Sequence, residues 1–534
     1  MYRIRQAVTQ ELREEVNIAD EGEGEDWRVI ESLGPCEKGK SCVHAGWTND
    51  EIGYIDAHSW NRSTKWMATL LVSCISGAVA FATAIPASLV TPISQDFGTS
   101  ELHETSATAT FLFGFGIGSL VTGPLSETFG RSLIFITTMS LMMVCLAIAG
   151  YADTLAQQVV FRFCAGFFGS SPLVCAGGSI SDLWTPHERI FVFPVFAILS
   201  YAGSSIAPVV GGAVVRSGAS WRWGDWITII ATGVMLFLVI ACLPETFRPI
   251  LLKYKTRIMA VETKKKRAEN VIVNERQAGP KLWYQVMQGL YRPFVLTAHE
   301  GIVVLYTWYI AVIYIILLTF LNGFNFIFSD IYGYDEVKTG LTFLAQLIGN
   351  CMAAFLIPYA NRFYNRDLER VHGRANEHNK KQETDHGETI DKAAITPPPE
   401  SHLYYAMVGA PFIPVSLFWM AYTSRPDITP WSPIIASSLF GFGFTTVFIS
   451  CYQYLTACYG IWSASALAAV NCLRALLSGG MMMASLPMYS NIGVMWSLTI
   501  LGIASALMVP VPYAFYLWGD KVRSYSRHAY KGGV

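Results

Sequence analysis

The sequence predicts an all-α, polytopic membrane protein whose roughly twelve transmembrane helices form two pseudo-symmetric six-helix bundles. Three observations lead to this prediction. Of the 534 residues, 52% are hydrophobic and only 14% are charged, a larger apolar share than a soluble core of this size normally holds. The apolar residues are gathered in runs of about 20, the length that crosses a bilayer. A basic segment at 244–293 separates the first six runs from the last six.

Residues 66–243 are expected to form the first bundle. Its apolar runs have the approximate limits 66–90, 105–121, 133–151, 157–181, 190–215 and 226–243. Residues 294–517 are expected to form the second bundle. Its runs have the approximate limits 294–322, 339–359, 403–422, 433–455, 463–486 and 495–517. Each run is long enough to cross the hydrocarbon core once.

Four polar segments flank or interrupt the bundles. Residues 1–65 carry an acidic cluster and lack the apolar core of a cleavable signal, so we expect a disordered cytoplasmic tail. Residues 244–293 are expected to be a cytoplasmic linker. Residues 361–401 are polar and end near three consecutive prolines, which predicts a disordered cytoplasmic loop inside the second bundle. Residues 518–534 are expected to form a cytoplasmic C-terminal tail.

The distribution of basic residues predicts the orientation, because Lys and Arg gather on the cytoplasmic side of membrane proteins. Arg131, Arg189 and the basic residues of 253–267, 362–381 and 521–527 fall on one face, so both termini are expected to be cytoplasmic. Acids are expected on the opposite face, where Arg216, Arg222 and Arg425 are exceptions. These acids are Asp96, Glu101, Glu104, Asp153, Asp330, Asp335 and Glu336.

Several functional classes are disfavoured. The net charge of −1 and the lack of a basic face argue against a nucleic-acid partner. No phosphate-binding loop occurs, which argues against an ATP-driven pump. No metal or nucleophile constellation recurs at one membrane face, so we expect neither an enzyme nor a cofactor. Cys36, Cys42 and His44 lie near one another, but their spacing fits no familiar zinc pattern.

A tight junction joins the second and third apolar runs. It reads Gly123-Pro-Leu-Ser-Glu127-Thr-Phe-Gly130-Arg131 and combines turn-forming glycines with opposite charges. This spacing resembles the motif between spans 2 and 3 of the major facilitator superfamily, which implies a secondary transporter. In that family the acid of the motif faces the start of span 11, here near Ser463, and the arginine pairs with an acid at the end of span 4, here Asp182. The resemblance thus implies that these groups hold the cytoplasmic side shut; the alternative is a set of solvated loop charges.

Further runs resemble the fungal branch of the twelve-span drug:proton antiporters. They are 166–184, 244–248, 292–294, 340–343 and 463–468. The resemblance implies proton-coupled export of a hydrophobic or amphipathic small molecule, such as a drug, toxin or secondary metabolite, by alternating access. It implies a monomer in the lipid bilayer of the plasma membrane, or alternatively of the vacuole, whose partners are the substrate and protons. Uptake by proton symport is the alternative function.

Two features of the first half carry specific expectations. Arg162 lies within span 4 in a run that resembles the arginine-containing motif of the family, which implies a role in proton coupling; the alternative is an arginine that snorkels or pairs structurally. Span 5 contains Gly203, Pro208, Gly211 and Gly212 and resembles the antiporter motif of the family. A small-residue packing face without directional meaning is the alternative there.

The second half supplies candidate binding groups. Glu300 is expected about two turns inside span 7, where a partly buried carboxylate suits reversible protonation or binding of a cation. The alternative is an acid near the helix N-terminus that the helix dipole stabilises. Arg474 follows Asn471 near the middle of span 11, and it is expected to face a cavity or to pair with a carboxylate. Aromatic residues at similar depth are expected to line the pocket with these two, although packing is their alternative role. They are Tyr309, Tyr314 and Tyr452.

Overall fold

Twelve helical segments long and apolar enough to cross a bilayer are present in the described part of this chain. The computed structural model describes residues 57–247, 250–251, 287, 291, 300–382, 397–460 and 463–526. All twelve segments overlap the predicted runs, and the prediction of an all-α, twelve-span fold is confirmed. The expected disordered tail up to residue 56, most of the linker and Cys36, Cys42 and His44 lie outside the described residues.

The first bundle contains six spans. Its helices are η1 Ala57–Ser59, α3 Arg62–Ala84, η2 Ile85–Ser88, α4 Val90–Phe97, α5 Glu101–Phe129, α6 Arg131–Gly150, α7 Leu155–Gly169, α8 Ser171–Leu183, α9 Arg189–Arg216 and α10 Trp223–Cys242. A short 3₁₀ turn, η2, extends the first span, and the fourth span is broken into two helices. Helices α7 and α8 together make span 4. Pro172 at the start of α8 removes a helical hydrogen-bond donor at this break.

The second bundle repeats the plan with more interruptions. Its helices are α13 Gly301–Phe324, η3 Asn325–Ile331, α14 Glu336–Met352, η4 Ala353–Leu356, α15 Ile357–Gln382, η6 Pro399–Leu403, α16 Tyr404–Gly409, α17 Phe412–Thr423, α18 Trp431–Tyr459, α19 Ser463–Ile492, α20 Val494–Met508 and α21 Pro510–Tyr525. Element η3 is a wide π-helical turn that continues α13.

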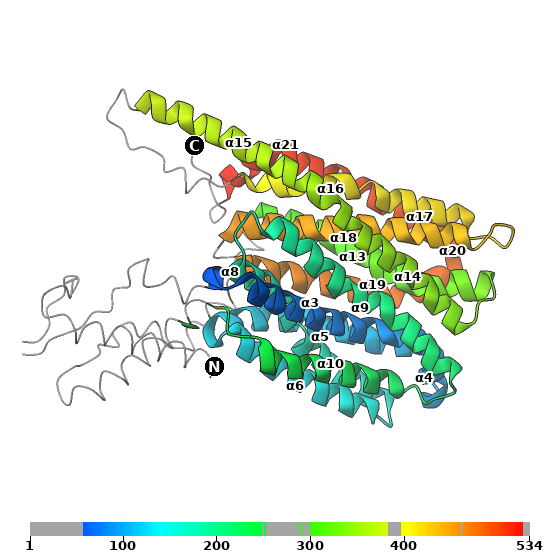
Figure 1. The fold of residues 1–534 in the computed structure, drawn as a ribbon. Coiled ribbons are helices and arrows are strands. Elements are labelled where there is room, and N and C mark those ends of the chain that lie inside the picture. The colour runs from blue at the N-terminus through cyan, green and yellow to red at the C-terminus, as the bar shows by residue number, and fades with distance from the viewer. Residues whose placement is uncertain are drawn as a thin grey trace, which may run out of the picture.

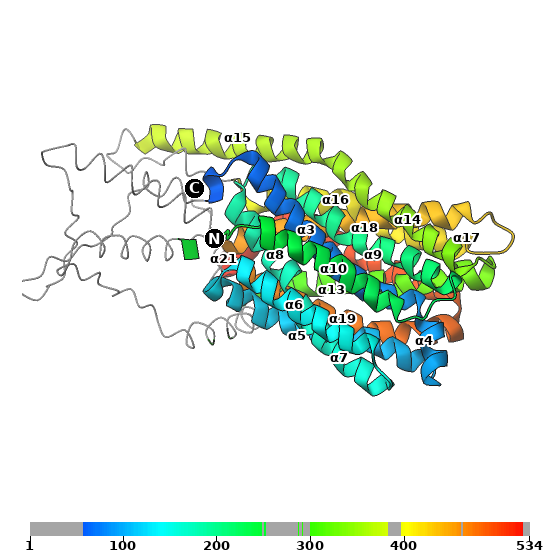
Figure 2. The same ribbon diagram turned by 60° about the horizontal axis from the view of Figure 1, so that its bottom comes forward.

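The two bundles lie side by side along their length, as Figures 1 and 2 show. Helix α5 packs against α19, and α9 packs against α14, so two helix pairs join the halves. We call the face that holds the first and last described residues, the α5–α6 junction and the α8–α9 junction the terminal face. The other end of the bundles, with the α6–α7 and α9–α10 junctions, is the opposite face.

Glycines let the helices of the first bundle approach backbone to backbone. Gly114 on α5 faces the Phe163 carbonyl of α7, and Gly166 on α7 faces the Phe111 carbonyl of α5. A β-carbon at either position would overlap the facing carbonyl. This reciprocal contact is the kind of small-residue packing that joins helices in membranes, where the hydrophobic effect supplies little attraction between them.

The expected disordered loop at 361–401 is wrong for its described residues, because α15 continues the chain as a helix from Ile357 to Gln382 and extends beyond the bundle in both views (Figures 1 and 2). One face of this polar helix has partners. The ring of Phe363 stacks on Tyr404 with centroids 4.4 Å apart, and the Tyr404 hydroxyl donates to Asp367 at 3.1 Å. Residues 399–403 are helical too. Phe363 and Asp367 lie one helical turn apart on α15, and both contact Tyr404. These contacts help to hold a polar segment in a helix.

We expect Gly166→Ala to lower the thermal unfolding midpoint of the purified protein in detergent. The added methyl group overlaps a backbone carbonyl, and overpacking of this kind typically costs about 1 to 3 kcal/mol. Tryptophan fluorescence during heating measures the change. Gly480→Ala is the control, because a β-carbon at Gly480 has no neighbour within 4 Å. Equal midpoints for the two variants would contradict the packing described for α5 and α7.

Candidate functional site

A buried ion pair fastens the α5–α6 junction at the terminal face. Nε of Arg131 lies 2.6 Å from Oδ2 of Asp182 at the end of α8, and the arginine is only 5% exposed. The guanidinium lies over Gly178, where any side chain would displace it. The turn between the helices uses Gly130 with φ of 99°, a conformation that favours glycine. The structure therefore brings together the arginine and the acid that the resemblance paired.

Glu245 completes this cluster, and the sequence analysis did not single it out. Its Oε1 accepts a hydrogen bond from the backbone N–H of Arg131 at 2.9 Å, and its Oε2 accepts from the N–H of Ser132 at 3.1 Å. The carboxylate thus satisfies two free donors at the start of α6 and lies at the positive end of that helix. Phe247 lies 5.3 Å from the Arg131 guanidinium. We call Arg131, Asp182 and Glu245 the charge lock.

The remaining hairpin residues lie around the charge lock. Gly123 is buried inside α5, about two helical turns before Gly130. Glu127 is half-buried and adds negative charge near Arg131. Its expected approach to Ser463 at the start of span 11 stays a prediction.

A second buried ionic cluster lies near the opposite face of the first bundle. Nη2 of Arg162 on α7 lies 2.6 Å from Oδ1 of Asp225 on α10, and both side chains are almost fully buried. Glu104 on α5 is only 1% exposed, and neither of its carboxylate oxygens has a hydrogen-bond partner in the described structure. The sequence analysis placed Glu104 at the surface because it began span 2 at Thr105, whereas α5 begins at Glu101. We call Glu104, Arg162 and Asp225 the buried triad.

A buried, uncharged polar side chain, that of Gln158, lies close to the buried triad in the sequence of α7. It lies one helical turn before Arg162, is fully buried, and has no hydrogen-bond partner on either polar atom of its side chain. Buried polar groups are normally hydrogen-bonded, so each exception calls for an explanation. Glu104 interacts electrostatically with Arg162 and Asp225, and Gln158 precedes Arg162 by one turn, so four polar side chains from three helices lie in this part of the bundle.

Glu300 lies at the terminal face of the second bundle. It is the N-cap residue of α13, which begins at Gly301, so it does not lie two turns inside the described helix as expected. The Tyr459 hydroxyl donates to its Oε2 at 3.3 Å, and the Ser526 hydroxyl donates to the same oxygen. The carboxylate is 1% exposed and is tied to the ends of α18 and α21. The structure thus separates Glu300 from Arg162 by the length of the membrane-spanning helices.

The small residues of α9 create two close helix contacts. Gly203 faces the Gly77 carbonyl of α3, and Gly211 faces Ser88. Gly212 faces the backbone of Glu336 on α14, so it joins the two bundles near the opposite face. Gly340 makes the reciprocal contact with the carbonyl of Pro208. Helix α9 is continuous through Pro208. Its contacts with α14 hold the first bundle against the second.

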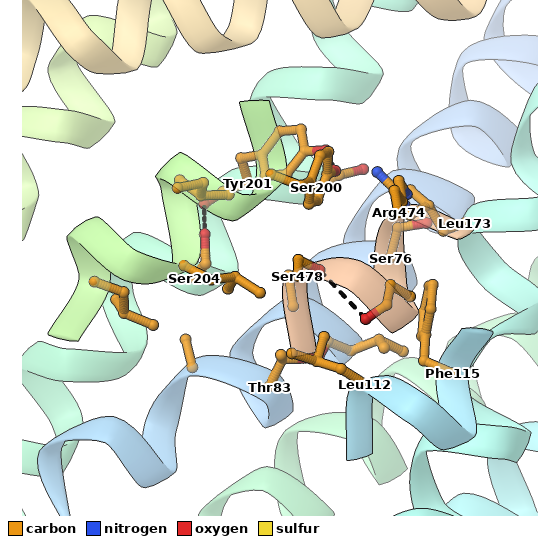
Figure 3. Close-up of a pocket in the computed structure, with 18 of the residues that line it drawn as sticks. Ser76, Thr83, Leu112, Phe115, Leu173, Ser200, Tyr201, Ser204, Arg474 and Ser478 are labelled. Carbon is orange, nitrogen blue, oxygen red and sulfur yellow. Dashed lines mark hydrogen bonds between the residues drawn. The ribbon is translucent and has the colours of Figure 1, made fainter. Parts of the chain in front are cut away.

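A central cavity lies between the bundles; the space there that atoms do not fill, open solvent included, is about 910 Å³. Helices from both halves line it. Its polar lining residues other than arginine and tyrosine are Ser76, Thr83, Ser200, Ser204, Gln346 and Ser478. Figure 3 shows several of these side chains directed toward a common space together with Arg474.

Arg474 is the charged residue of this cavity. It is 1% exposed, and its guanidinium carbon lies 3.9 Å from the centre of the Tyr314 ring. The Tyr314 hydroxyl is hydrogen-bonded to that of Tyr201, which also lines the cavity and belongs to the first bundle. Two of the five predicted binding residues, Tyr314 and Arg474, therefore line the cavity.

The other three predicted binding residues lie outside the cavity lining. The Tyr452 hydroxyl donates to Oδ1 of Asn471 at 2.6 Å, so these two residues tie α18 to α19 within the second bundle. Tyr309 is buried against Tyr306, with ring centroids 6.4 Å apart. Depth along the helix was the signal that suggested these residues, but depth does not say which side of the helix faces the cavity.

The bundles contact each other on both sides of the cavity. At the terminal face Nε2 of Gln453 donates to the carbonyl of Arg189 at 3.2 Å. At the opposite face Nδ2 of Asn325 donates to the carbonyl of Ala87 at 3.4 Å. The surface pair Arg222–Asp96 also lies at the opposite face. There, hydrogen bonds from Trp221 and Arg222 hold the pKa of Asp96 below its ordinary value.

Comparisons with known proteins agree with this architecture. The family model described as Major Facilitator Superfamily matches residues 70–478. The MFS-type transporter kojT of Aspergillus flavus is 39% identical over 472 residues, which cover 88% of this chain and 80% of that protein. The MFS-type efflux pump MFS2 of Trichophyton rubrum is 32% identical over 472 residues, covering 88% and 75%. The solved proton:xylose symporter XylE aligns with 86% of this chain and 97% of its own at a TM-score of 0.60 and 14% identity, a likeness of fold alone.

We expect Arg131→Ala to open the terminal face. Breaking a buried ion pair by removing one partner typically costs about 3 to 5 kcal/mol, which corresponds to a change of about 150- to 5,000-fold in an opening equilibrium. Cys175 reports this opening, because its thiol is 1% exposed and lies near Arg131. In a variant that keeps only this cysteine, maleimide labelling in detergent is expected to become about tenfold faster or more.

The matched control for this experiment is Arg222→Ala. The Arg222 and Asp96 side chains are 33% and 46% exposed, and surface pairs contribute less than about 1 kcal/mol. Labelling of Cys175 is expected to stay unchanged in this variant. If Arg131→Ala also leaves the labelling rate unchanged, the charge lock does not hold the terminal face closed.

Proposed function

The chain belongs to the major facilitator superfamily, and on this premise we propose that it exports a hydrophobic or amphipathic small molecule from the cytoplasm in exchange for protons. It is a multi-pass membrane protein and a secondary transporter. The observation that carries the proposal is the central cavity between two bundles that touch each other on both sides of it. Rocking of one bundle against the other then exposes the cavity to one side of the membrane at a time.

Orientation follows from the distribution of basic residues. Arg131, Arg189, Arg362 and Arg523 lie at the terminal face, which we assign to the cytoplasm with both termini. The charge lock then closes the cytoplasmic side while the cavity is open to the outside. We place the protein in the plasma membrane as a monomer, with the vacuolar membrane as the alternative.

Two observations support export rather than uptake. The small residues of α9 from Gly203 to Gly212 resemble the antiporter motif of the family, and two residues of this stretch, Pro208 and Gly212, contact α14 where the bundles must separate when the outer side opens. One similar protein is an efflux pump by name. Secondary metabolites, drugs and toxins with an apolar body match the leucine and aromatic lining of the cavity.

We assign the proton to the buried triad. It holds two carboxyl groups and one guanidinium, so its charge is −1 when both acids are ionised and zero when one is protonated. Burial in an apolar bundle favours the neutral state. Asp225 is paired with Arg162, whereas Glu104 has no hydrogen-bond partner and is the acid that takes the proton. In the assigned orientation this site lies near the outer face, where protons enter.

Helix α5 connects proton binding to the gate. Glu104 lies in its first turn, and the turn that carries Arg131 follows its last residue, Phe129. Span 4 repeats the arrangement, with Arg162 near one end and Asp182 near the other. A change in charge at the outer end of these helices can therefore shift the charge lock at the cytoplasmic end by moving the helices as rigid bodies.

Cells that express the protein are expected to retain less of at least one compound from a panel of antifungals and fungal metabolites than cells with an empty vector. A protonophore should remove the difference, because the proton gradient supplies the energy. Retention measured by mass spectrometry checks this. Equal retention across the panel contradicts export, and higher retention in expressing cells indicates symport.

We expect Glu104→Gln to abolish proton-driven transport while leaving gradient-independent exchange of substrate across proteoliposome membranes intact. The amide keeps the shape of the side chain but cannot take up a proton. Glu101→Gln is the control, because Glu101 is exposed on the same helix and hydrogen-bonds Thr91 at 2.9 Å. Glu300→Gln tests the other predicted proton carrier: loss of coupling there, with normal coupling in Glu104→Gln, would move the proton site to the second bundle.

A further inference from the structure

We propose that the central cavity binds a small organic anion, with one carboxylate held by Arg474 and Ser200 and an apolar ring system held by the leucines and tyrosines around them. This inference rests on the proposed transport function and specifies the substrate class of the same cavity. It begins from the donors that the cavity leaves unsatisfied.

Arg474 is buried without a charged partner among the described residues. The other buried arginines of the described chain each face a carboxylate: Arg131 faces Asp182, Arg162 faces Asp225, and Arg523 faces Glu400 at 3.0 Å. Nε and Nη1 of Arg474, in contrast, have no hydrogen-bond partner in the part of the chain that the structure describes. None of the described residues that line the cavity is an aspartate, a glutamate or a histidine. A guanidinium in this setting is costly unless something else neutralises it.

The ring of Tyr314 satisfies only part of this demand. The centre of this ring lies 3.9 Å from the central carbon of the guanidinium. The N–H groups point outward in the plane of the guanidinium, and those on Nε and Nη1 have no partner among the described residues, so they are available to a ligand. An oxyanion in that plane can accept two parallel hydrogen bonds, which is the strongest arrangement that arginine makes with a ligand.

Ser200 supplies a further donor from the other bundle. It is 2% exposed, lines the cavity on α9, and its hydroxyl has no hydrogen-bond partner. Ser204 and Ser478 differ, because each donates to a carbonyl of its own helix. Figure 3 shows Ser200 and Arg474 bordering the same space. An anion between them would contact both bundles at once, as a transported substrate must.

The rest of the lining determines the body of the ligand. Its large apolar residues come from both bundles and are Leu112, Phe115, Leu173, Leu317, Leu318 and Leu321. The rings of Tyr201 and Tyr314 add flat surfaces. This combination favours a compact aromatic acid over a polyol, which would leave many hydroxyl groups unpaired, and over a cation, which Arg474 repels.

The test uses the purified full-length protein in detergent at neutral pH and three probes of nearly equal shape: 2-naphthoate, neutral 2-naphthamide and cationic 2-naphthylmethylamine. A ligand that binds the folded state raises the thermal unfolding midpoint by an amount that increases with its concentration relative to its Kd. We expect 2-naphthoate to raise the midpoint with dose and the other two to have little effect. Arg474→Gln is expected to weaken 2-naphthoate binding about tenfold or more. Ser200→Ala is expected to weaken it less.

Arg222→Gln at the opposite face is the control and is expected to bind 2-naphthoate as the natural protein does. The comparison of the three probes on the natural protein decides the matter even if Arg474→Gln does not fold. Equal or stronger stabilisation by the amide or the amine overturns the proposal. So does an absence of stabilisation by 2-naphthoate and by smaller benzoate, or an undiminished effect in folded Arg474→Gln. Binding needs no gradient, so carboxylate-selective binding without proton-driven export would refute the proposed function alone.

Discussion

The cost of holding a guanidinium away from water governs the layout of this molecule. A charged group in the apolar interior must be paired, hydrogen-bonded or directed into a polar space. Arg131 and Arg162 meet this requirement through carboxylates on other helices, at distances of 2.6 Å. Each pair fixes the relative position of two spans. Arg474 meets it only partly, through an aromatic face, and so marks the place where the protein has left room.

The buried charges are distributed unequally between the two bundles. The first bundle carries the charge lock and the buried triad, at opposite ends of α5 and of span 4. The second bundle carries Arg474, although the cavity is lined from both sides. Our proposals therefore place proton binding and gating in one half and recognition of the ligand in both. In that scheme, motion between the halves couples the two tasks.

Much of the fold could be predicted from the sequence because span length and apolar content depend on local composition. The pairing of Arg131 with Asp182 was also accessible, since the hairpin resembles a known motif. The contacts of Glu245 and Asp225 were not, because their partners lie 114 and 63 residues away in the chain and no spacing rule connects them. Glu104 was misplaced for a different reason: a helix boundary shifted by one turn moved a buried acid to the surface. Tyr452 and Asn471 were predicted from their depth in the membrane, which does not give the direction of a side chain; they lie outside the cavity lining, and their role in binding stays a prediction.

The glycine contacts between α9 and α14 have a consequence for how the two bundles can separate. At Gly212 and Gly340 the main chain of one helix lies directly against that of the other, with no side chain of either glycine between them. The charge lock at the terminal face differs, because its ion pair lies within the first bundle and stiffens that bundle rather than crossing to the second. In the proposed transport cycle the bundles would therefore part along a narrow backbone contact at one face and beside a stiffened helix junction at the other.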